Sequence, residues 1–187
     1  MFLQAIIKPW EIFVSEKNNA NYFKIFKNMA IAFILYYLFY LIFKVIPNYE
    51  LSLKLYPSRD PSILAVLFNS LGAIILFAIL LVFFFSVLFI AFLISKILKG
   101  RGSFKQLFYL ISIVGPLLAI VAYFFWPLSI LIFLYFLTVA VKESQGFSLI
   151  KSIIISILSV TLGFMPIILI IISFVLGAGG LGAGMRF

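Results

Sequence analysis

The segment SILAVLFNSLGAIILFAILLVFFFSVLFIAFLIS, from Ser62 to Ser95, contains no charged residue and determines the fold class. At about 1.5 Å per residue, a helix of this length exceeds the roughly 30 Å of hydrocarbon in a bilayer. Asp60 and Pro61 favour a helix start, because a carboxylate can cap the first turn and proline fits the first helical position. We predict one long helix whose membrane part covers about 68–93, with its earlier turns outside the hydrocarbon or tilted.

Apolar runs on both sides of this segment predict four more spans. Pro47 ends the run before it, and the uncharged stretch from Leu107 to Val141 is long enough for two short helices. Proline lacks an amide hydrogen and clashes with the preceding helical turn, so we expect helix breaks at three prolines, Pro116, Pro127 and Pro166. The predicted fold class is all-α, a polytopic transmembrane helix bundle with five spans at about 29–46, 68–93, 107–125, 127–141 and 152–176.

The chain divides into three parts on this basis. Residues 1–28 mix apolar and charged side chains and are expected to form one or two short amphipathic helices in the headgroup region. Residues 29–176 are the membrane domain, in which the outer loop 47–61 has alternating apolar and polar residues that suit a short strand or an interfacial strip. Residues 177–187 are rich in glycine and are expected to form a flexible tail.

Basic residues predict the orientation, because lysine and arginine concentrate on the cytoplasmic side of membrane proteins. With five spans, one side carries Lys8, Lys17, Lys24, Lys27, Lys96, Lys99, Arg101, Lys105, Lys142 and Lys151. The other side carries Lys44, Lys54, Arg59 and Arg186. We therefore expect a cytoplasmic N-terminus and a C-terminus outside.

The composition argues against most kinds of catalysis. The 187 residues are 66% hydrophobic and 10% charged, whereas soluble domains have about 25% charged residues. The chain has no cysteine and no histidine, so it lacks thiolate nucleophiles and the usual metal ligand and proton carrier. The five acidic residues fall on both sides of the predicted membrane, which separates them. We predict that the protein is not an enzyme and needs no cofactor or metal.

The net charge of +9 comes from basic residues that lie beside apolar runs. This arrangement favours the lipid bilayer and its anionic headgroups as partners over nucleic acid. A membrane-protein partner or a second copy of the chain is the other kind of partner that we consider.

A loop with four cations follows the longest apolar run. The cations are Lys96, Lys99, Arg101 and Lys105. One interpretation is simple positive-inside orientation, with Phe104 dipping into the interface. The other is a contact site for an acidic partner or a phosphorylated lipid headgroup. Because Gly100 and Gly102 lie between the cations, we expect the loop to be flexible.

Small residues form a stripe on the last predicted helix. The stripe consists of Ser152, Ser156, Ser159 and Gly163, which share one helical face. Small side chains let membrane helices approach closely, so the stripe predicts a helix-packing seam, with a polar pathway or an oligomer contact as the alternative. For Asn69, within the longest apolar run, the two interpretations are an interhelical hydrogen bond and a substrate contact.

Four segments in order resemble the Yip domain family (Ypt/Rab-interacting protein), whose members are five-span membrane proteins with a cytoplasmic N-terminus. These segments are the Pro9 to Phe13 element, GRGSFKQ at Gly100–Gln106, YLISIVGPL at Tyr109–Leu117 with its proline at Pro116, and VKESQGFSLIK at Val141–Lys151. The resemblance covers roughly Lys8 to Leu176.

The resemblance implies a role in association. Eukaryotic members reside in endoplasmic reticulum and Golgi membranes, where they associate with Rab-type GTPases and with partners of the same fold. Those members have a longer N-terminal region, so this chain is more similar to a minimal prokaryotic member, which would reside in the cell membrane as a multi-pass protein.

We therefore predict a non-enzymatic integral membrane protein that acts by association, in membrane organisation, a trafficking-like role or complex assembly. The alternative is a permease or channel-like protein for a small solute, because discontinuous helices often line transport sites. A continuous cavity lined by Asn69, Ser112, Thr138 and the Ser152 stripe would favour transport, and a filled bundle would favour association.

Overall fold

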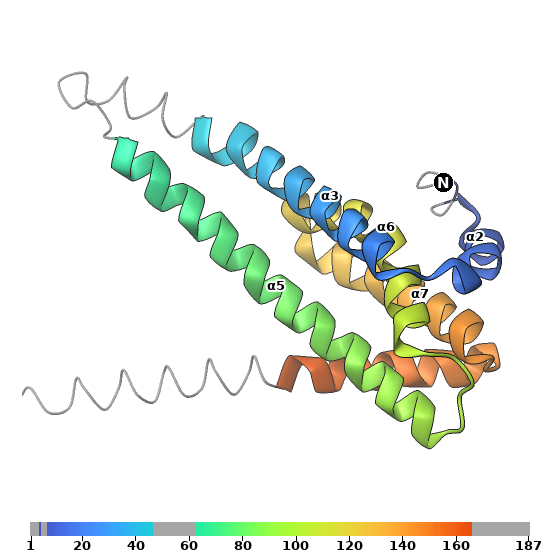
Figure 1. The fold of residues 1–187 in the computed structure, drawn as a ribbon. Coiled ribbons are helices and arrows are strands. Elements are labelled where there is room, and N and C mark those ends of the chain that lie inside the picture. The colour runs from blue at the N-terminus through green and yellow to red at the C-terminus, as the bar shows by residue number, and fades with distance from the viewer. Residues whose placement is uncertain (1–3, 5–6, 47–62, 166–187) are drawn as a thin grey trace, which may run out of the picture.

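The structure is a computed structural model that describes residues 4, 7–46 and 63–165. All regular structure in these residues is helical (Figure 1). The elements are α2 Pro9–Glu16, η1 Lys17–Asn19, α3 Tyr22–Tyr40, η2 Leu41–Val45, α5 Ile63–Ile97, α6 Phe104–Phe124, α7 Trp126–Gln145 and a last helix, Leu149–Met165. The predicted loop 47–61, the break at Pro166 and the tail 177–187 lie outside the described residues.

Four helices are long and apolar enough to cross a membrane. They are Tyr22–Lys44, Phe77–Ile97, Phe104–Phe124 and Pro127–Gln145. The all-α prediction is confirmed for the described residues. The four apolar helices are consistent with a membrane protein, because a helix satisfies its backbone hydrogen bonds internally in a medium without water. The fifth predicted span, 152–176, is described only as far as Met165, in a helix that is apolar but shorter than the other four.

The first of these helices begins earlier than the predicted residue 29. Asn21 has an extended backbone, and its side-chain oxygen accepts a hydrogen bond from the Phe23 amide at 3.0 Å, which caps α3 at Tyr22. Lys24 therefore lies in the first turns of α3, where its long side chain can reach water from a helix that enters the membrane.

The predicted loop from Lys142 to Lys151 is wrong. Helix α7 continues to Gln145 and the last helix begins at Leu149, so only a short turn separates them. Gly146 ends α7 in a left-handed conformation at φ 74, with its amide donating to the Lys142 carbonyl at 2.9 Å. Lys142 and Glu143 carry charge but remain in the last turn of α7.

The predicted breaks at Pro116 and Pro127 have different outcomes. Pro116 is buried inside α6, which continues through it to Phe124, so it does not end a helix. Pro127 lies in the first turn of α7, where proline is tolerated because that amide has no partner within the helix. The chain direction changes just before it, at Phe125, which has φ −152 and ψ 82.

Helix α6 is the centre of the bundle. In its apolar 18-residue stretch 61% of the residues are buried, compared with 17% in the corresponding stretch of α5. Helices α3 and α7 both pack on α6, and α2 packs on α7 (Figure 1). Helix α5 is buried mainly in its second half, at Val87, Leu88, Ala91 and Ser95, so its contact with the bundle is concentrated towards its C-terminal end.

Candidate functional site

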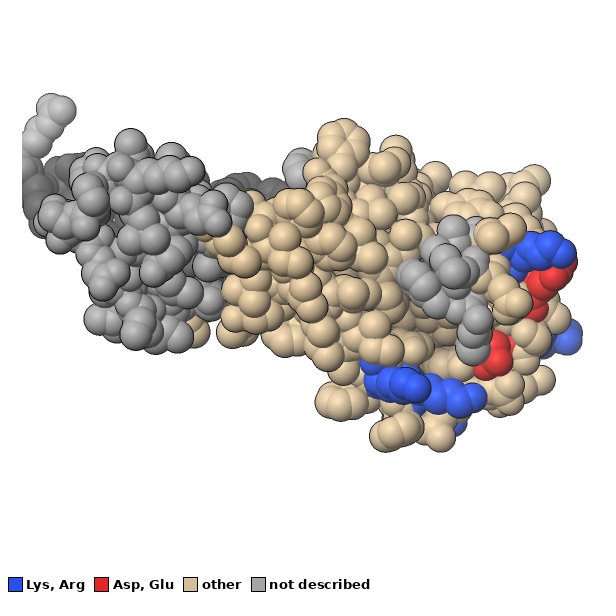
Figure 2. Space-filling model, turned by 90° about the horizontal axis from the view of Figure 1, so that it is seen from above, with Lys and Arg blue, Asp and Glu red and all other residues tan. Residues whose placement is uncertain are grey.

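Charged side chains collect at one end of the bundle. The start of α3, the end of α5, the start of α6, the end of α7 and the start of the last helix meet there, together with α2. We call this the basic end; it carries Lys8, Lys17, Lys24, Lys27, Lys96, Lys99, Arg101, Lys105, Lys142 and Lys151, and the acidic residues Glu11, Glu16 and Glu143. Figure 2 shows that lysine, arginine and acidic side chains on the visible face gather at the right-hand end of the view.

Few of these cations have an acidic partner. Lys8 pairs with Glu11 at 3.0 Å, Lys142 with Glu143 at 3.2 Å, and Lys24 approaches Glu16 at 4.0 Å. At the basic end, the cations without an ion pair to a described residue are Lys17, Lys27, Lys96, Lys99, Arg101, Lys105 and Lys151. The basic end therefore keeps an excess of uncompensated positive charge.

The α5–α6 connection, residues 98–103, begins with a close helix cap. The Gly100 amide donates to the Ser95 carbonyl at 2.7 Å, and the Lys99 amide donates to the Lys96 carbonyl at 3.0 Å. This is the Schellman pattern, which normally has glycine in the left-handed position. Lys99 occupies that position at φ 64, a conformation that costs a residue with a Cβ about 1–2 kcal/mol.

The same connection packs against the end of α7. The Arg101 amide donates to the Gln145 carbonyl at 3.2 Å. A Cβ on Gly102 would overlap the Ser144 carbonyl, and a Cβ on Gly100 would lie 2.7 Å from the Gln145 side-chain oxygen. The two glycines are therefore needed for close approach, and the expectation of a flexible loop is wrong because this loop is packed and hydrogen-bonded.

A capping box closes the connection. The Ser103 hydroxyl accepts from the Gln106 amide at 3.2 Å, and the Gln106 side chain accepts from the Ser103 amide at 2.9 Å. The pattern Ser-x-x-Gln before an apolar run is a helix-start signal that was available in the sequence and was not used there. It positions Lys105 in the first turn of α6, 5.7 Å from the centre of the Tyr22 ring.

Behind this connection lies a buried amide. Gln145 is 1% exposed, and neither its side-chain oxygen nor its nitrogen has a hydrogen-bond partner among the described residues. The buried Ser144 hydroxyl also has no hydrogen-bond partner among the described residues. Buried polar groups are normally paired with protein or water, so the site has the polarity to hold a bound water molecule.

A polar network joins the N-terminal segment to the bundle. The Tyr109 hydroxyl donates to Glu16 at 2.8 Å, the Ser112 hydroxyl donates to the Tyr109 carbonyl at 2.7 Å, and the Asn28 amide donates to the Ser112 hydroxyl at 3.1 Å. Tyr109 is 1% exposed. No sequence pattern pointed to this network, because its members are far apart in the chain.

Helix α2 has apolar residues on two faces. On the inner face, Phe13 is fully buried and contacts Phe136, with ring centres 6.4 Å apart. On the outer face, Trp10 and Val14 are exposed, and Ile7 is exposed just before the helix begins. The ring of Trp10 also meets Tyr135 edge-on at 6.0 Å and lies under the Lys142 ammonium. An exposed apolar stripe with tryptophan beside lysine is typical of a helix at a membrane interface.

The small-residue stripe lies on the buried face of the last helix. Ser152, Ser156 and Ser159 are fully buried, and Gly163 is buried too. A Cβ on Gly163 would overlap the side chain of Val87, so this position touches α5. The Ser156 hydroxyl has no partner among the described residues. This geometry matches close helix packing.

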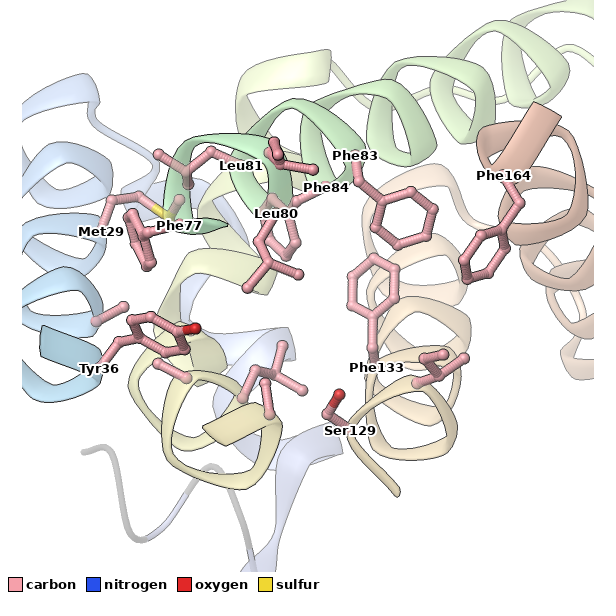
Figure 3. A pocket seen from close by; sticks show the side chains of 17 residues that line it. Met29, Tyr36, Phe77, Leu80, Leu81, Phe83, Phe84, Ser129, Phe133 and Phe164 are labelled. Atoms are coloured by element: carbon pink, nitrogen blue, oxygen red, sulfur yellow. The ribbon is translucent and has the colours of Figure 1, made fainter. Parts of the chain in front are cut away.

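The described polar residues of the predicted solute path do not line the apolar cavity of the bundle. An apolar cavity of about 360 Å³ lies between α3, α5, α6, α7 and the last helix (Figure 3). Ser112, Thr138 and Ser152 are not among its lining residues. The Ser112, Thr138 and Ser152 hydroxyls instead donate to backbone carbonyls, at 2.7, 2.9 and 3.0 Å. The Asn69 side chain lies outside what the structure describes.

Metal binding finds no support in the described part of the chain, where no three His, Cys, Asp or Glu side chains cluster.

No family model, curated protein or solved structure matches this chain. The resemblance to the Yip domain family therefore stays a prediction. The four segments that suggested it lie close together in the fold. Glu16 just after the first segment bonds Tyr109 of the third, and Arg101 of the second bonds Gln145 of the fourth. The protein is a helical membrane protein whose basic end is its best-defined polar site.

Proposed function

We propose that this protein acts by association at the cytoplasmic surface of a membrane, with the basic end as its contact site. In this proposal the chain has five spans, its N-terminus is cytoplasmic, and it recognises anionic headgroups or an acidic face of a membrane-protein partner. The observation that carries the proposal is the group of cations without an ion pair at the basic end, of which Lys99 and Arg101 lie on a connection held by backbone hydrogen bonds.

Electrostatics supports this choice. Each lysine or arginine near an anionic membrane surface contributes about 1 kcal/mol, and the cytoplasmic leaflet is the anionic one. Lys99 and Arg101 are exposed and stand on the hydrogen-bonded connection 98–103, so little conformational freedom is lost when a headgroup binds. The exposed stripe of α2 supplies apolar contact beside them.

The Yip resemblance adds a candidate setting. Members of that family assemble with membrane proteins of the same fold, so a second copy of this chain or a related chain is the first protein partner to seek. A cell-membrane location follows for a prokaryotic host, and an endoplasmic reticulum or Golgi location for a eukaryotic one.

The test compares two triple variants of equal charge change. The first is Lys99→Gln with Arg101→Gln and Lys105→Gln, which removes unpaired cations. The second is Lys8→Gln with Lys24→Gln and Lys142→Gln, which removes cations that have a carboxylate nearby. Each protein is crosslinked in its native membrane and purified in mild detergent, and bound proteins and lipids are identified by mass spectrometry.

The first triple variant is expected to lose the partner or the enriched anionic lipid, with about a hundredfold weaker binding if each cation contributes about 1 kcal/mol. The second is expected to keep most of it. Equal losses in both would show that only net charge matters. A wild-type protein free of any enriched partner or lipid would overturn the proposal.

The alternative function is a permease for an apolar solute, and the apolar cavity is the observation that favours it. It is tested by solute flux into liposomes. Flux above that of protein-free liposomes, lost on narrowing the cavity with Ala119→Leu, would replace association by transport.

A further inference from the structure

Two hollows adjoin on the side of the molecule away from the basic end, because they share two lining residues. The apolar cavity of about 360 Å³ reaches Tyr36 and Ala122, and a second hollow of about 400 Å³ begins at the same two residues. The second hollow extends to Lys44 and Tyr123, at the far ends of the first span and of α6. Their lining residues extend from the middle of the bundle to the end that lies away from the basic end, which we call the Lys44 end. We call the two adjoining hollows the path.

The inner part of this path is suited to hydrocarbon. Figure 3 shows Phe77, Phe83, Phe84 and Phe133 around it, and Tyr36 pointing its hydroxyl inwards. Cavities with such lining do not hold water, because a water molecule needs several polar partners. An empty space of this size would also forfeit dispersion contacts along its walls. Within a bilayer, a lipid chain is the material at hand to fill it.

The outer part of the path is polar. Lys44 is the one charged side chain at this end among the described residues, and it lies 5.4 Å from the centre of the Tyr40 ring. It belongs to η2, a π-helical segment over Leu41–Val45. Such segments are rare and often occur at functional sites. Here the cation and the tyrosines Tyr36, Tyr40 and Tyr123 surround the mouth of an apolar cavity.

We propose that this path binds one membrane phospholipid, with a hydrocarbon chain in the apolar cavity and the headgroup phosphate beside Lys44. A hydrocarbon chain is thin and flexible, so part of one can enter the apolar cavity of about 360 Å³. A single turn of helix with its side chains fills roughly 400–600 Å³ and exceeds the cavity. The cation next to the apolar space favours an amphiphile with an anionic head over a neutral apolar molecule. This site is remote from the basic end and does not depend on the proposed function.

The experiment uses the full chain in nanodiscs that contain a phospholipid with a photoreactive diazirine at mid-chain. After illumination, labelled peptides are mapped by mass spectrometry. Labelling is expected to concentrate on the cavity walls, at 77–84 on α5 and 115–133 on α6 and α7. The exposed faces of the same helices are expected to be labelled less. Uniform labelling of every lipid-facing surface in the wild-type protein would overturn the proposal without any variant.

Two pairs of variants locate the chain and the head. Ala122→Phe narrows the junction between the hollows and is expected to reduce cavity labelling to the level of the exposed faces. Its control is Leu38→Phe, which adds bulk on an exposed part of α3. Lys44→Gln is expected to weaken phospholipid retention through detergent exchange about fivefold, whereas Lys44→Arg retains it. Unchanged labelling in Ala122→Phe would contradict the chain site.

A neutral diacylglycerol that carries the same diazirine chain separates the contribution of the headgroup to binding from that of the chain. We expect it to label the cavity about fivefold less at equal concentration. Equal labelling by the two lipids would overturn the role of Lys44 and of the phosphate.

Discussion

The basic end and the Lys44 end are built in opposite ways. At the basic end, two chain turns touch through their backbones, glycines occupy the contact, and polar side chains are buried between helices. At the Lys44 end, aromatic rings surround a path that the protein leaves open. Helices gain no hydrophobic energy by meeting in lipid, so they pack tightly only where small residues or hydrogen bonds bring them together.

The largest expected effect breaks the tight contact at the basic end. Gly102→Val should destabilise the protein by about 3 kcal/mol, because its side chain would overlap the Ser144 carbonyl, which cannot move without α7. Thermal unfolding in detergent measures it. Gly72→Ala is the control in α5, where the nearest atom to a new Cβ is the Tyr40 hydroxyl at 4.0 Å. Equal stability of the two variants would refute the close contact between the α5–α6 connection and the end of α7.

A smaller loss is expected from the polar network at the basic end. Tyr109→Phe removes a hydrogen bond to a carboxylate and should cost about 2 kcal/mol. At the Lys44 end, Tyr123→Phe should leave the stability unchanged, since the Tyr123 hydroxyl has no hydrogen bond to the described residues. Both are read as shifts in the unfolding midpoint. A similar loss from both substitutions would remove this difference between the ends.

The two helix caps at the basic end should respond with opposite signs. Gly146→Ala should lose about 1 kcal/mol, because alanine is strained at φ 74 although no atom blocks its Cβ. Lys99→Gly should gain about 1 kcal/mol by relieving φ 64, while weakening the binding of anionic lipid. Unfolding and lipid-binding assays on the same samples test both effects. A destabilised Lys99→Gly protein would show that the lysine side chain supports the fold.

The smallest expected effect concerns the exposed ion pair at the basic end. Lys8→Ala removes a 3.0 Å contact to Glu11 between side chains that are 64% and 66% exposed. Such pairs contribute less than about 0.5 kcal/mol, so the unfolding midpoint should barely move. A clear loss of stability would mean that this ion pair helps to hold α2 in place.

Several features of the fold could be predicted from single segments. The uncharged run before Lys96 became one continuous helix, and Pro127 coincides with a helix start. Helix ends were predicted less well. The charged residues predict a helix start at 29 and a helix end before 142, whereas Asn21 and Gly146 set these two limits through their own backbone conformations.

The candidate site shows the same division. Its cations and glycines were visible in the sequence, and the Ser103 to Gln106 capping signal could have been found there. The contact of Gly102 with Ser144, the bond from Tyr109 to Glu16 and the cavity beside Ala122 could not, because each joins residues distant in the chain.

The sequence by itself determined that this protein is helical and lies in a membrane, because backbone groups in apolar segments must bond within their own helix when water is absent. The tertiary structure alone decided which turns touch, how α2 is held and where space remains. Helix formation depends on neighbours in the chain, whereas packing depends on how separate helices fit together in a solvent as apolar as their side chains.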